Sequence, residues 1–249
     1  MENIEKNLYQ FYFKIGMSES VKYIRENGYD IIISDKKYWP QIIFNLNNSI
    51  EPKKLITRIA TDFLNKRYTP FFIASDKYIT REHSAILKEN KILPVKILRG
   101  MSLFSAQIND LQLSPDIQII ELKEQRHITN FSELVNSEIM ASEMLFNPKL
   151  LNGLKLGGEI KIFGLFIGKE LASTLLVFTE TSNAGLYFIA TKKEFQKKGY
   201  ASILIRFVVN NLFEGGIKEV VLHANNFATG IYKKLGFTHQ NNFVIYKIL

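Results

Sequence analysis

The chain has 249 residues, of which 46% are hydrophobic and 12% aromatic, and it carries a formal net charge of +8 at pH 7 and no cysteine. This length suffices for one large domain or two modest ones, each with its own core. The lack of cysteine excludes disulfides, thiolate metal sites and a cysteine nucleophile. No apolar run approaches the ~20 residues of a membrane span. The polar N-terminus is unlike a signal peptide, so we expect a cytoplasmic protein with no membrane partner.

The positive charge raises the question of a nucleic-acid partner. Lysines are scattered through both halves and arginine is scarce, a pattern that disfavours nucleic acid and suits an anionic small molecule equally well. The four histidines (His83, His127, His223 and His239) lack metal-ligand spacing. Each is interpreted as an ordinary surface or hydrogen-bonded histidine, and we predict no metal site. The oligomeric state stays open between a monomer and a homodimer.

The first half of the chain predicts helices followed by a repeated strand–helix order. Two helices are expected before the strand YDIIIS, over residues 4–13 and 18–27. Apolar periodicity then predicts strand, helix, strand, helix and strand, over residues 39–46, 53–66, 70–75, 82–90 and 94–101. The polar stretch QINDLQLSP (107–115) predicts a boundary between domains at residues 1–110 and 111–249.

The second half predicts a strand, a helical stretch and a run of strands. DIQIIEL (116–122) alternates like a strand, and residues 126–140 and 144–151 have helical spacing, with a turn or new helix at Pro148. EIKIFGLFIG, ELASTLLVFTE and AGLYFIAT predict three successive strands. A buried helix over 201–213, ended by Gly215 and Gly216, precedes the strand EVVLHA, a short helix over 228–235 and a last strand over 241–249.

The two halves contain an internal repeat. SAILKENKILPVKI (84–97) and TGIYKKLGFTHQNN (229–242) match in register through a helix, its basic end and the following turn. The strand–helix order that leads to this element is also similar in both halves. We therefore infer a duplicated domain.

The stretch QKKGYAS (196–202) lies between a predicted strand and a buried helix. The first N–H groups of a helix have no partner within it, and together with the helix dipole they bind phosphate or pyrophosphate. Gly199 and the small Ala201 would let a phosphate reach the backbone, and Lys197 and Lys198 would add Coulombic attraction. Alone, this pattern also fits an ordinary turn.

A second motif makes the pattern specific. After one more strand comes HANNFATGIYKKLGF (223–237), which supplies Asn225, Ala228, Tyr232, Gly236 and Phe237. The combination resembles the GNAT superfamily of acyl-CoA-dependent N-acyltransferases over residues 116–249. The resemblance implies a GNAT fold of the α/β (α+β) class, in which helices flank a mixed central sheet. Here a smaller, diverged GNAT-like domain would precede it.

The resemblance also implies a site for acetyl-CoA as cosubstrate. The end of the strand LYFIAT would bind the pantetheine arm, and the following loop with the start of the helix would bind the pyrophosphate. Asn225 or Asn226 would reach the pantetheine from the next strand, which should splay away from LYFIAT around the thioester. The cofactor-binding residues expected on this basis are Ile189, Ala190, Thr191, Gln196, Lys197, Lys198, Gly199, Tyr200, Ala201, Ser202, Asn225 and Asn226.

Tyr232 stands where many family members carry the tyrosine that protonates the leaving CoA thiolate. A tyrosine on a short helix over a sheet is also commonly a packing residue. Some relatives carry a glutamate base at the position of Gly185, so the base here is open. Glu138, Glu143 and Glu180 are candidates by position, and an ordered water is the alternative.

The first half lacks the groups for this chemistry. Leu87 aligns with Tyr232 and Lys91 with Gly236. The loop NNSIEPKKLI (47–56) has no glycine, and Pro52 removes a backbone donor. We expect that this half does not bind CoA and that it closes one side of an acceptor cleft or stabilises the second half.

The leading hypothesis is an N-acetyltransferase that acts on a primary amine of a small molecule or peptide, by direct attack in a ternary complex. One alternative is a non-catalytic acyl-CoA-binding or regulatory module. Another is an aminoacyl-tRNA-dependent transferase, which would predict salt-dependent tRNA binding and a poor CoA site.

Overall fold

The N-terminal half alternates short apolar strands with helices. The structure, a computed structural model, describes residues 2–35, 37–47, 50–65, 71–104, 113–140, 144–152 and 158–248. The elements of this half are α1 (Asn3–Gly16), β1 (Lys22–Glu26), β2 (Tyr29–Ile33), β3 (Tyr38–Trp39), β4 (Gln41–Phe44), α2 (Pro52–Leu64), β5 (Phe71–Ser75), α3 (Arg81–Glu89) and β6 (Ile92–Phe104). The predicted order of strand, helix, strand, helix and strand from residue 39 onward is confirmed.

The C-terminal half begins with a strand and a helix and continues into three long strands. Its elements are β7 (Ile117–Glu121), α4 (Gln125–Glu138), β8 (Leu145–Phe146), α5 (Lys149–Asn152), β9 (Ile160–Ile167), β10 (Glu170–Thr179), β11 (Asn183–Thr191), α6 (Tyr200–Glu214), β12 (Glu219–Ala224), α7 (Thr229–Lys234) and β13 (Thr238–Ile248). The predicted strands and the buried helix of this half are confirmed.

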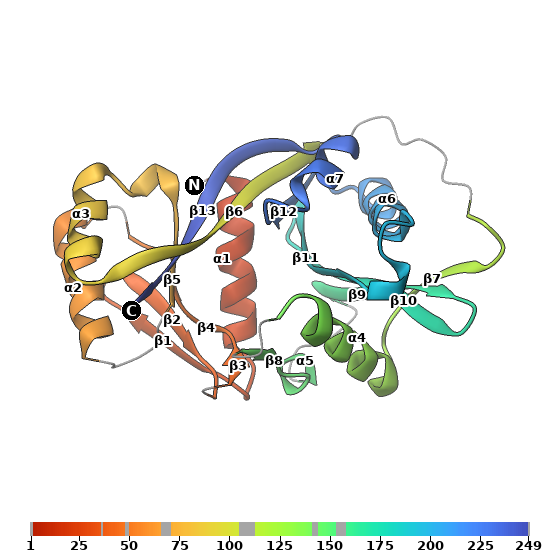
Figure 1. Cartoon of the computed structure of the whole chain (residues 1–249), viewed down its shortest axis with the longest axis horizontal. Coiled ribbons are helices and arrows are strands. Elements are labelled where there is room, and N and C mark those ends of the chain that lie inside the picture. Colours follow the sequence, from red (N-terminus) through yellow and green to blue (C-terminus); the bar gives the residue numbers. More distant parts are fainter. Residues whose placement is uncertain are drawn as a thin grey trace.

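In the described part of the chain, one mixed sheet of eleven strands runs through both halves, in the order β1-β2-β4-β5-β13-β6-β12-β11-β10-β9-β7. The long strands β6 and β13 cross between the halves (Figure 1). The C-terminal strand β13 lies between β5 and β6, and β6 pairs with β12. Each half therefore completes the sheet of the other, and the α+β class with helices flanking a mixed sheet is confirmed.

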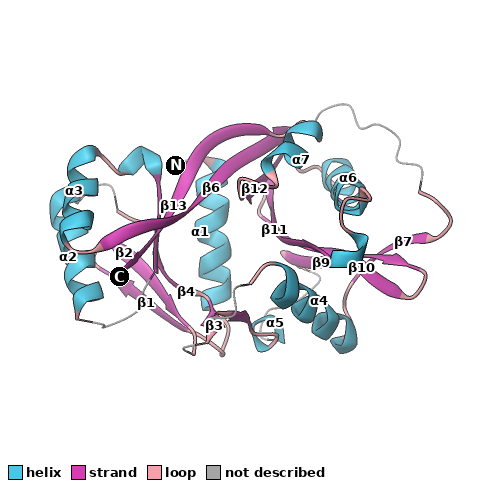
Figure 2. Ribbon diagram, in the orientation of Figure 1, coloured by secondary structure: helices cyan, strands magenta, loops and turns pink. Residues whose placement is uncertain are grey.

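Helices cover the sheet at its two ends and at its centre (Figure 2). α2 and α3 pack on the N-terminal strands, while α6 and α7 share a core with β9–β12. α1 lies in the middle, between the halves (Figure 1). Its residues Ile4 and Leu8 belong to a core with Ile32 and Phe243, whereas Phe11 and Ile15 belong to the core of α4. This helix therefore joins the hydrophobic cores of both halves.

The internal repeat is visible in the backbone. Lys91 follows α3 with φ +58°, and Gly236 follows α7 with φ +92°. Leu87 and Tyr232, which align in the repeat, are both buried. Leu98 and Phe243, which the same alignment equates, pair across the centre of the sheet. The helix and the left-handed turn after it are thus retained in both copies.

Two predicted helices and one predicted strand are wrong in part. Residues 22–26 of the expected helix 18–27 form β1, because Gly28 at φ +119° turns the chain into an antiparallel hairpin with β2. Leu145 and Phe146 form β8, which pairs with β3, so helix begins only at Lys149. Pro40 follows a cis peptide bond and separates β3 from β4. Long-range pairing overrides local periodicity at these places.

The predicted domain boundary stays a prediction. Residues 107–112 of the polar stretch lie outside the described residues. In the described part of the chain, no helix is both long and apolar enough to span a membrane.

Candidate functional site

The parallel strands β11 and β12 separate at their carboxyl ends. Their pairing runs from Asn183–Glu219 to Leu186–Leu222 and ends there. Beyond this point β11 pairs only with β10, and β12 continues along β6 to Ala224. We call the open region between residues 187–191 and 223–224 the β11–β12 fork. The predicted splay of these strands is confirmed.

A β-bulge shapes the β11 side of the fork. The register with β10 shifts between Leu176–Tyr187 and Thr174–Ala190, and Phe188 has φ +49°. Among the described residues, no strand pairs with the edge of β11 that faces β12 over Ile189, Ala190 and Thr191. The Ser173 hydroxyl donates to the Ala190 carbonyl at 2.9 Å, which ties this segment to β10. Apart from the Ala190 and Thr191 carbonyls, which accept from Ser173 and Gln196, backbone groups on the open edge are therefore available to an extended ligand.

The loop after β11 leads into the N-terminus of α6. Gly199 is the N-cap at φ +85°, and an added Cβ there would have no atom within 4 Å. No side chain of a described residue caps the helix. The first-turn N–H groups of Tyr200, Ala201 and Ser202 have no partner within a helix, so they and the helix dipole favour an anion. Gly199 supplies the left-handed conformation and leaves space above these donors.

Gln196, Lys197 and Lys198 lie on the exposed approach to this helix N-terminus. The Gln196 Nε2 donates to Glu138 Oε2 at 2.9 Å and to the Thr191 carbonyl at 3.0 Å. The Lys193 N–H donates to the other oxygen of Glu138 at 3.3 Å. Glu138, a candidate base by position, thus anchors the loop to the end of α4. The positive field of the two lysines adds to that of the helix dipole.

Asn225 and Asn226 follow β12 on the other side of the fork. The Ala228 N–H donates to Asn225 Oδ1 at 2.9 Å, so this oxygen holds the turn into α7. Arg99 Nε donates to Asn226 Oδ1 at 3.3 Å. Both side-chain oxygens are therefore engaged within the protein. The amide nitrogens are the groups through which these side chains would donate to a ligand.

Tyr232 lies on α7 within the core shared by α6 and β12. Its side chain is largely buried and its ring lies 6.1 Å from that of Phe237. Burial raises the pKa of the Tyr232 phenol to about 12. The hydroxyl is therefore protonated at neutral pH and can donate a proton or a hydrogen bond.

Asn7 of α1 occupies the space next to Gly185, a contact that the sequence did not predict. An added Cβ on Gly185 would lie 2.0 Å from Oδ1 of Asn7, which is 0% exposed on α1. Asn7 Nδ2 donates to Asn183 Oδ1 at 2.7 Å, and the Tyr187 hydroxyl donates to Asn7 Oδ1 at 2.8 Å. A glutamate at this position has no room, because α1 of the N-terminal half occupies it. The one signal of this contact in the sequence is Asn7, a polar residue on the otherwise apolar face of the predicted first helix.

The other candidate bases are placed differently. Glu180 accepts a hydrogen bond from Asn7 Nδ2 at 3.3 Å and pairs with Lys6 at 3.7 Å. Glu143 lies outside the described residues. Within the described residues no group of three or more histidines, aspartates and glutamates is arranged to hold a metal ion.

His223 differs from the sequence interpretation. Both ring nitrogens are buried and have no hydrogen-bond partner among the described residues. The ring lies against Phe243, with centroids 4.6 Å apart, and beside Tyr187. Burial lowers the pKa of His223 to about 3. The expectation of an ordinary surface or hydrogen-bonded histidine is therefore wrong for His223, which borders the fork.

Comparisons with known proteins agree with this geometry. Residues 134–237 match the family model described as Acetyltransferase (GNAT) family. A GCN5-related N-acetyltransferase from Kribbella flavida is similar over 100% of this chain and 96% of its own, with a TM-score of 0.75 and 9% identity. A second such protein, from Sphaerobacter thermophilus, covers 88% of this chain and 79% of its own, with a TM-score of 0.64 and 12% identity.

The whole-chain similarity extends to a protein with two GNAT units. A tandem GNAT protein from the clavulanic acid biosynthesis pathway covers 98% of this chain and 95% of its own, with a TM-score of 0.63 and 10% identity. Among proteins of curated function, none matches the sequence. At these identities the structural similarity shows the fold alone. The chain carries a GNAT acetyltransferase domain at residues 134–237, within a fold that solved GNAT proteins share over its full length.

Proposed function

We propose that this protein transfers an acetyl group from acetyl-CoA to the primary amine of a small molecule or peptide. The observation that carries the proposal is the uncapped N-terminus of α6, with left-handed Gly199 beside the β11–β12 fork. An anionic pyrophosphate suits the helix N-terminus. An extended pantetheine suits the free edge of β11, since its amides can pair with strand backbone.

The proposed reaction proceeds by direct attack within a ternary complex. The neutral amine nitrogen bonds to the thioester carbonyl carbon, and the carbonyl oxygen becomes an oxyanion. Backbone N–H groups at the β11 bulge would stabilise that charge. The carbon–sulfur bond then breaks, and Tyr232 would give its phenolic proton to the thiolate. The proposal assigns no side chain to remove the amine proton, and water is one acceptor for it.

The cofactor-binding residues form three groups in this proposal. Ile189, Ala190 and Thr191 would hold the pantetheine through their backbone. The loop and helix start from Gln196 to Ser202 would hold the pyrophosphate, while Asn225 and Asn226 would donate from the opposite side of the fork. The polar contacts of Gln196 support this grouping, because they fix the loop between β11 and α4.

Acetyl-CoA binding by calorimetry tests the cofactor site. Gly199→Ala should weaken binding at least ten-fold, because the methyl group enters the space above the helix N-terminus. Gly168→Ala is the matched control, since Gly168 also has a positive φ, +58°, and open space around its Cβ. Both variants carry similar backbone strain, but only the first should lose affinity. Wild-type protein that does not bind acetyl-CoA would contradict the proposal.

The reaction itself is tested by CoA-thiol release with acetyl-CoA and a panel of amines. The panel comprises polyamines, amino acids, aminoglycosides and peptide N-termini. Turnover of at least one amine is expected. Binding of acetyl-CoA without turnover would instead identify an acyl-CoA-binding module. Salt-dependent tRNA binding without acetyl-CoA binding would identify a tRNA-dependent transferase.

A further inference from the structure

A half-open cavity of about 220 Å³ lies in the N-terminal half, away from the β11–β12 fork. It sits at the carboxyl ends of the parallel strands β4 and β5, between the loops that lead into α2 and α3. These strands pair only at Ile43 and Phe72, so they also separate. Ligands of α/β sheets bind at such places, where two loops diverge beyond the strand ends. The cavity is thus the counterpart, in the first copy of the repeat, of the proposed cofactor site.

Its volume is small compared with that of an acyl-CoA. At the packing density of protein interiors, 220 Å³ accommodates roughly ten non-hydrogen atoms. An acyl-CoA is several times larger. The ligand of this cavity must therefore be a small molecule of its own kind.

One wall of the cavity is apolar. It is formed by Leu46 and Ile50 from the β4–α2 loop and by Leu55 and Ile56 from the start of α2. Leu55 and Ile56 are buried in the core of the N-terminal half. This wall suits an aliphatic chain of a few carbons.

The rest of the described lining is polar and carries positive charge. It contains Lys77, Thr80 and His83, and the lining includes no acidic side chain. The Thr80 N–H donates to His83 Nδ1 at 3.0 Å, and the His83 N–H donates to Thr80 Oγ1 at 3.3 Å. These reciprocal bonds hold His83 at the N-terminus of α3. The cavity therefore combines an apolar wall with donors and a cation, which is the pairing that a carboxylate with an aliphatic tail requires.

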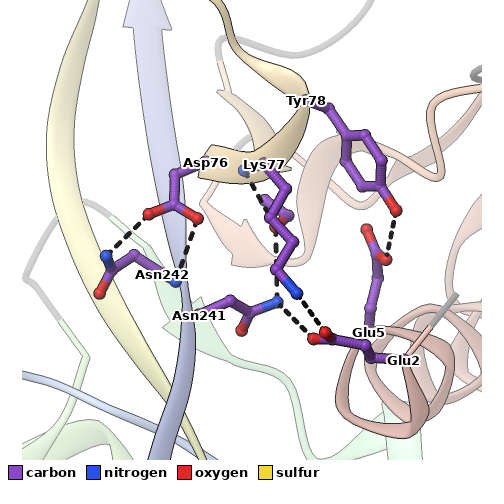
Figure 3. Close-up of polar contacts among 8 residues, drawn as sticks. Glu2, Glu5, Asp76, Lys77, Tyr78, Asn241 and Asn242 are labelled. Carbon is purple, nitrogen blue, oxygen red and sulfur yellow. Dashed lines mark hydrogen bonds and ion pairs between the residues drawn. The ribbon is translucent and has the colours of Figure 1, made fainter.

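Lys77 is connected to α1 as well as to the cavity. Figure 3 shows its Nζ directed at the carboxylate of Glu2 on the segment that enters α1. Both side chains are about half exposed, 40% and 50%. Such an exposed pair contributes little to stability, so Lys77 can turn toward an anion in the cavity at little cost. Beside it, the Tyr78 hydroxyl donates to Oε2 of buried Glu5 at 3.0 Å.

We propose that this cavity is a second ligand site, which binds a small carboxylate with an aliphatic tail of about four carbons. The carboxylate would contact Lys77 and Thr80, and the tail would lie on Leu55 and Ile56. The site is independent of the proposed acetyl transfer. Lys77 and Tyr78 connect the cavity to Glu2 and Glu5 at the start of α1. The same helix packs on β11 beside the fork.

Titration of the full chain with isovalerate, followed by calorimetry, tests the site. We expect saturable binding of one isovalerate per chain. Isoamyl alcohol, which keeps the tail and removes the charge, should bind at least ten-fold more weakly, as should acetate, which keeps the charge and lacks the tail. Equal affinity for the alcohol, or no saturable isovalerate binding, would overturn the proposal.

Variants locate the binding. Ile50→Trp should abolish it by filling the cavity from a half-buried loop position, and Lys77→Met should weaken it at least five-fold. Lys54→Met is the control for charge, because Lys54 pairs with Glu51 outside the cavity. Unchanged isovalerate affinity in Ile50→Trp would overturn the assignment. Acetyl-CoA affinity, measured on the same samples, should stay at the wild-type value, so failure of either proposal is distinguished from failure of the other.

Discussion

The molecule contains two copies of one arrangement, at the carboxyl ends of the parallel pairs β4–β5 and β11–β12. In both, parallel strands separate and each continues through a loop into a helix. After β11 the helix begins behind left-handed Gly199, with open donors. After β4 it begins at Pro52, which has no N–H group. The scaffold can thus persist while the anion-binding groups are lost from one copy.

The helices that follow the second strand of each pair show the same division. Both α3 and α7 are followed by a left-handed residue, although it is Lys91 in one copy and Gly236 in the other. The turn is needed in both places because β6 and β13 must each cross to the other half. Leu87 and Tyr232 are both buried, but only Tyr232 has a proton to donate. Shared packing is therefore retained in both copies, whereas the phenol is present in the second copy and absent from the first at this position.

Separating the copies should have the largest effect. A fragment of residues 112–249 lacks β6 and β5, which pair with β12 and β13. It should lose cooperative folding, since two long strands would be left without partners. Circular dichroism melts and amide NMR dispersion measure this. Coexpression of residues 1–111 with the fragment should restore the fold, and a soluble, well-dispersed fragment on its own would contradict the prediction.

Changing the contact between the copies should have the next largest effect. Gly185→Ala should destabilise the chain by about 3 kcal/mol, because the new methyl group collides with Asn7 Oδ1 on α1 and with the ring of Tyr187, which bonds to Asn7. Urea denaturation measures the free energy of unfolding. The double variant Gly185→Ala/Asn7→Ala should show strong coupling, with a loss smaller than the sum of the two single losses. Additive losses would show that the collision is not the cause.

The buried phenol should separate catalysis from binding. Tyr232→Phe should lower kcat ~100-fold, because the thiolate loses its proton donor, while acetyl-CoA affinity stays the same. Tyr246→Phe is the control: burial also raises the pKa of Tyr246 to about 12, but this tyrosine stacks on Phe72 in the N-terminal half. A full kcat in Tyr232→Phe would identify Tyr232 as a packing residue.

His223 should give the smallest effect, visible only in acid. His223 pairs with Gly100 in the neighbouring strand. The repeat aligns Gly100 with Ile245, and Ile245 pairs with Ile73. Ile73 is thus the counterpart of His223. The pKa of His223 is lowered to about 3, so between pH 6.5 and 3 the unfolded chain binds the extra proton. Stability should fall as pH drops through this window, by about 1.4 kcal/mol per unit at most.

The substitution His223→Ile tests this assignment. In the variant, the free energy of unfolding should no longer show the contribution of His223 to its pH dependence. The contributions of the carboxylates should remain. Urea denaturation at pH 4.5 and 7 measures the difference between the two proteins. Parallel pH profiles for the two proteins would rule out His223 as the source.

Much of the fold and the site could be predicted from local pattern. The apolar runs of β9, β10, β11 and α6 are readable because each segment packs apolar side chains into the core. The loop at Gly199 and the motif through Tyr232 are contiguous, so their spacing is visible in the chain. By contrast, β1 and β8 are short, and their strand pairing depends on a partner elsewhere. The burial of His223 is likewise set by neighbouring strands and Phe243.

By itself, the sequence determined the repeated order of elements. It also indicated a loop suited to an anion before α6 and showed that the first copy has no glycine in the corresponding loop. These are properties of residue type and spacing, which act over a few neighbouring positions. Only the tertiary structure decided that β6 and β13 cross between the copies and that α1 occupies the space at Gly185. Those contacts join residues more than a hundred positions apart, such as Asn7 and Asn183. Their free energy comes from packing and hydrogen bonds that no local stretch contains.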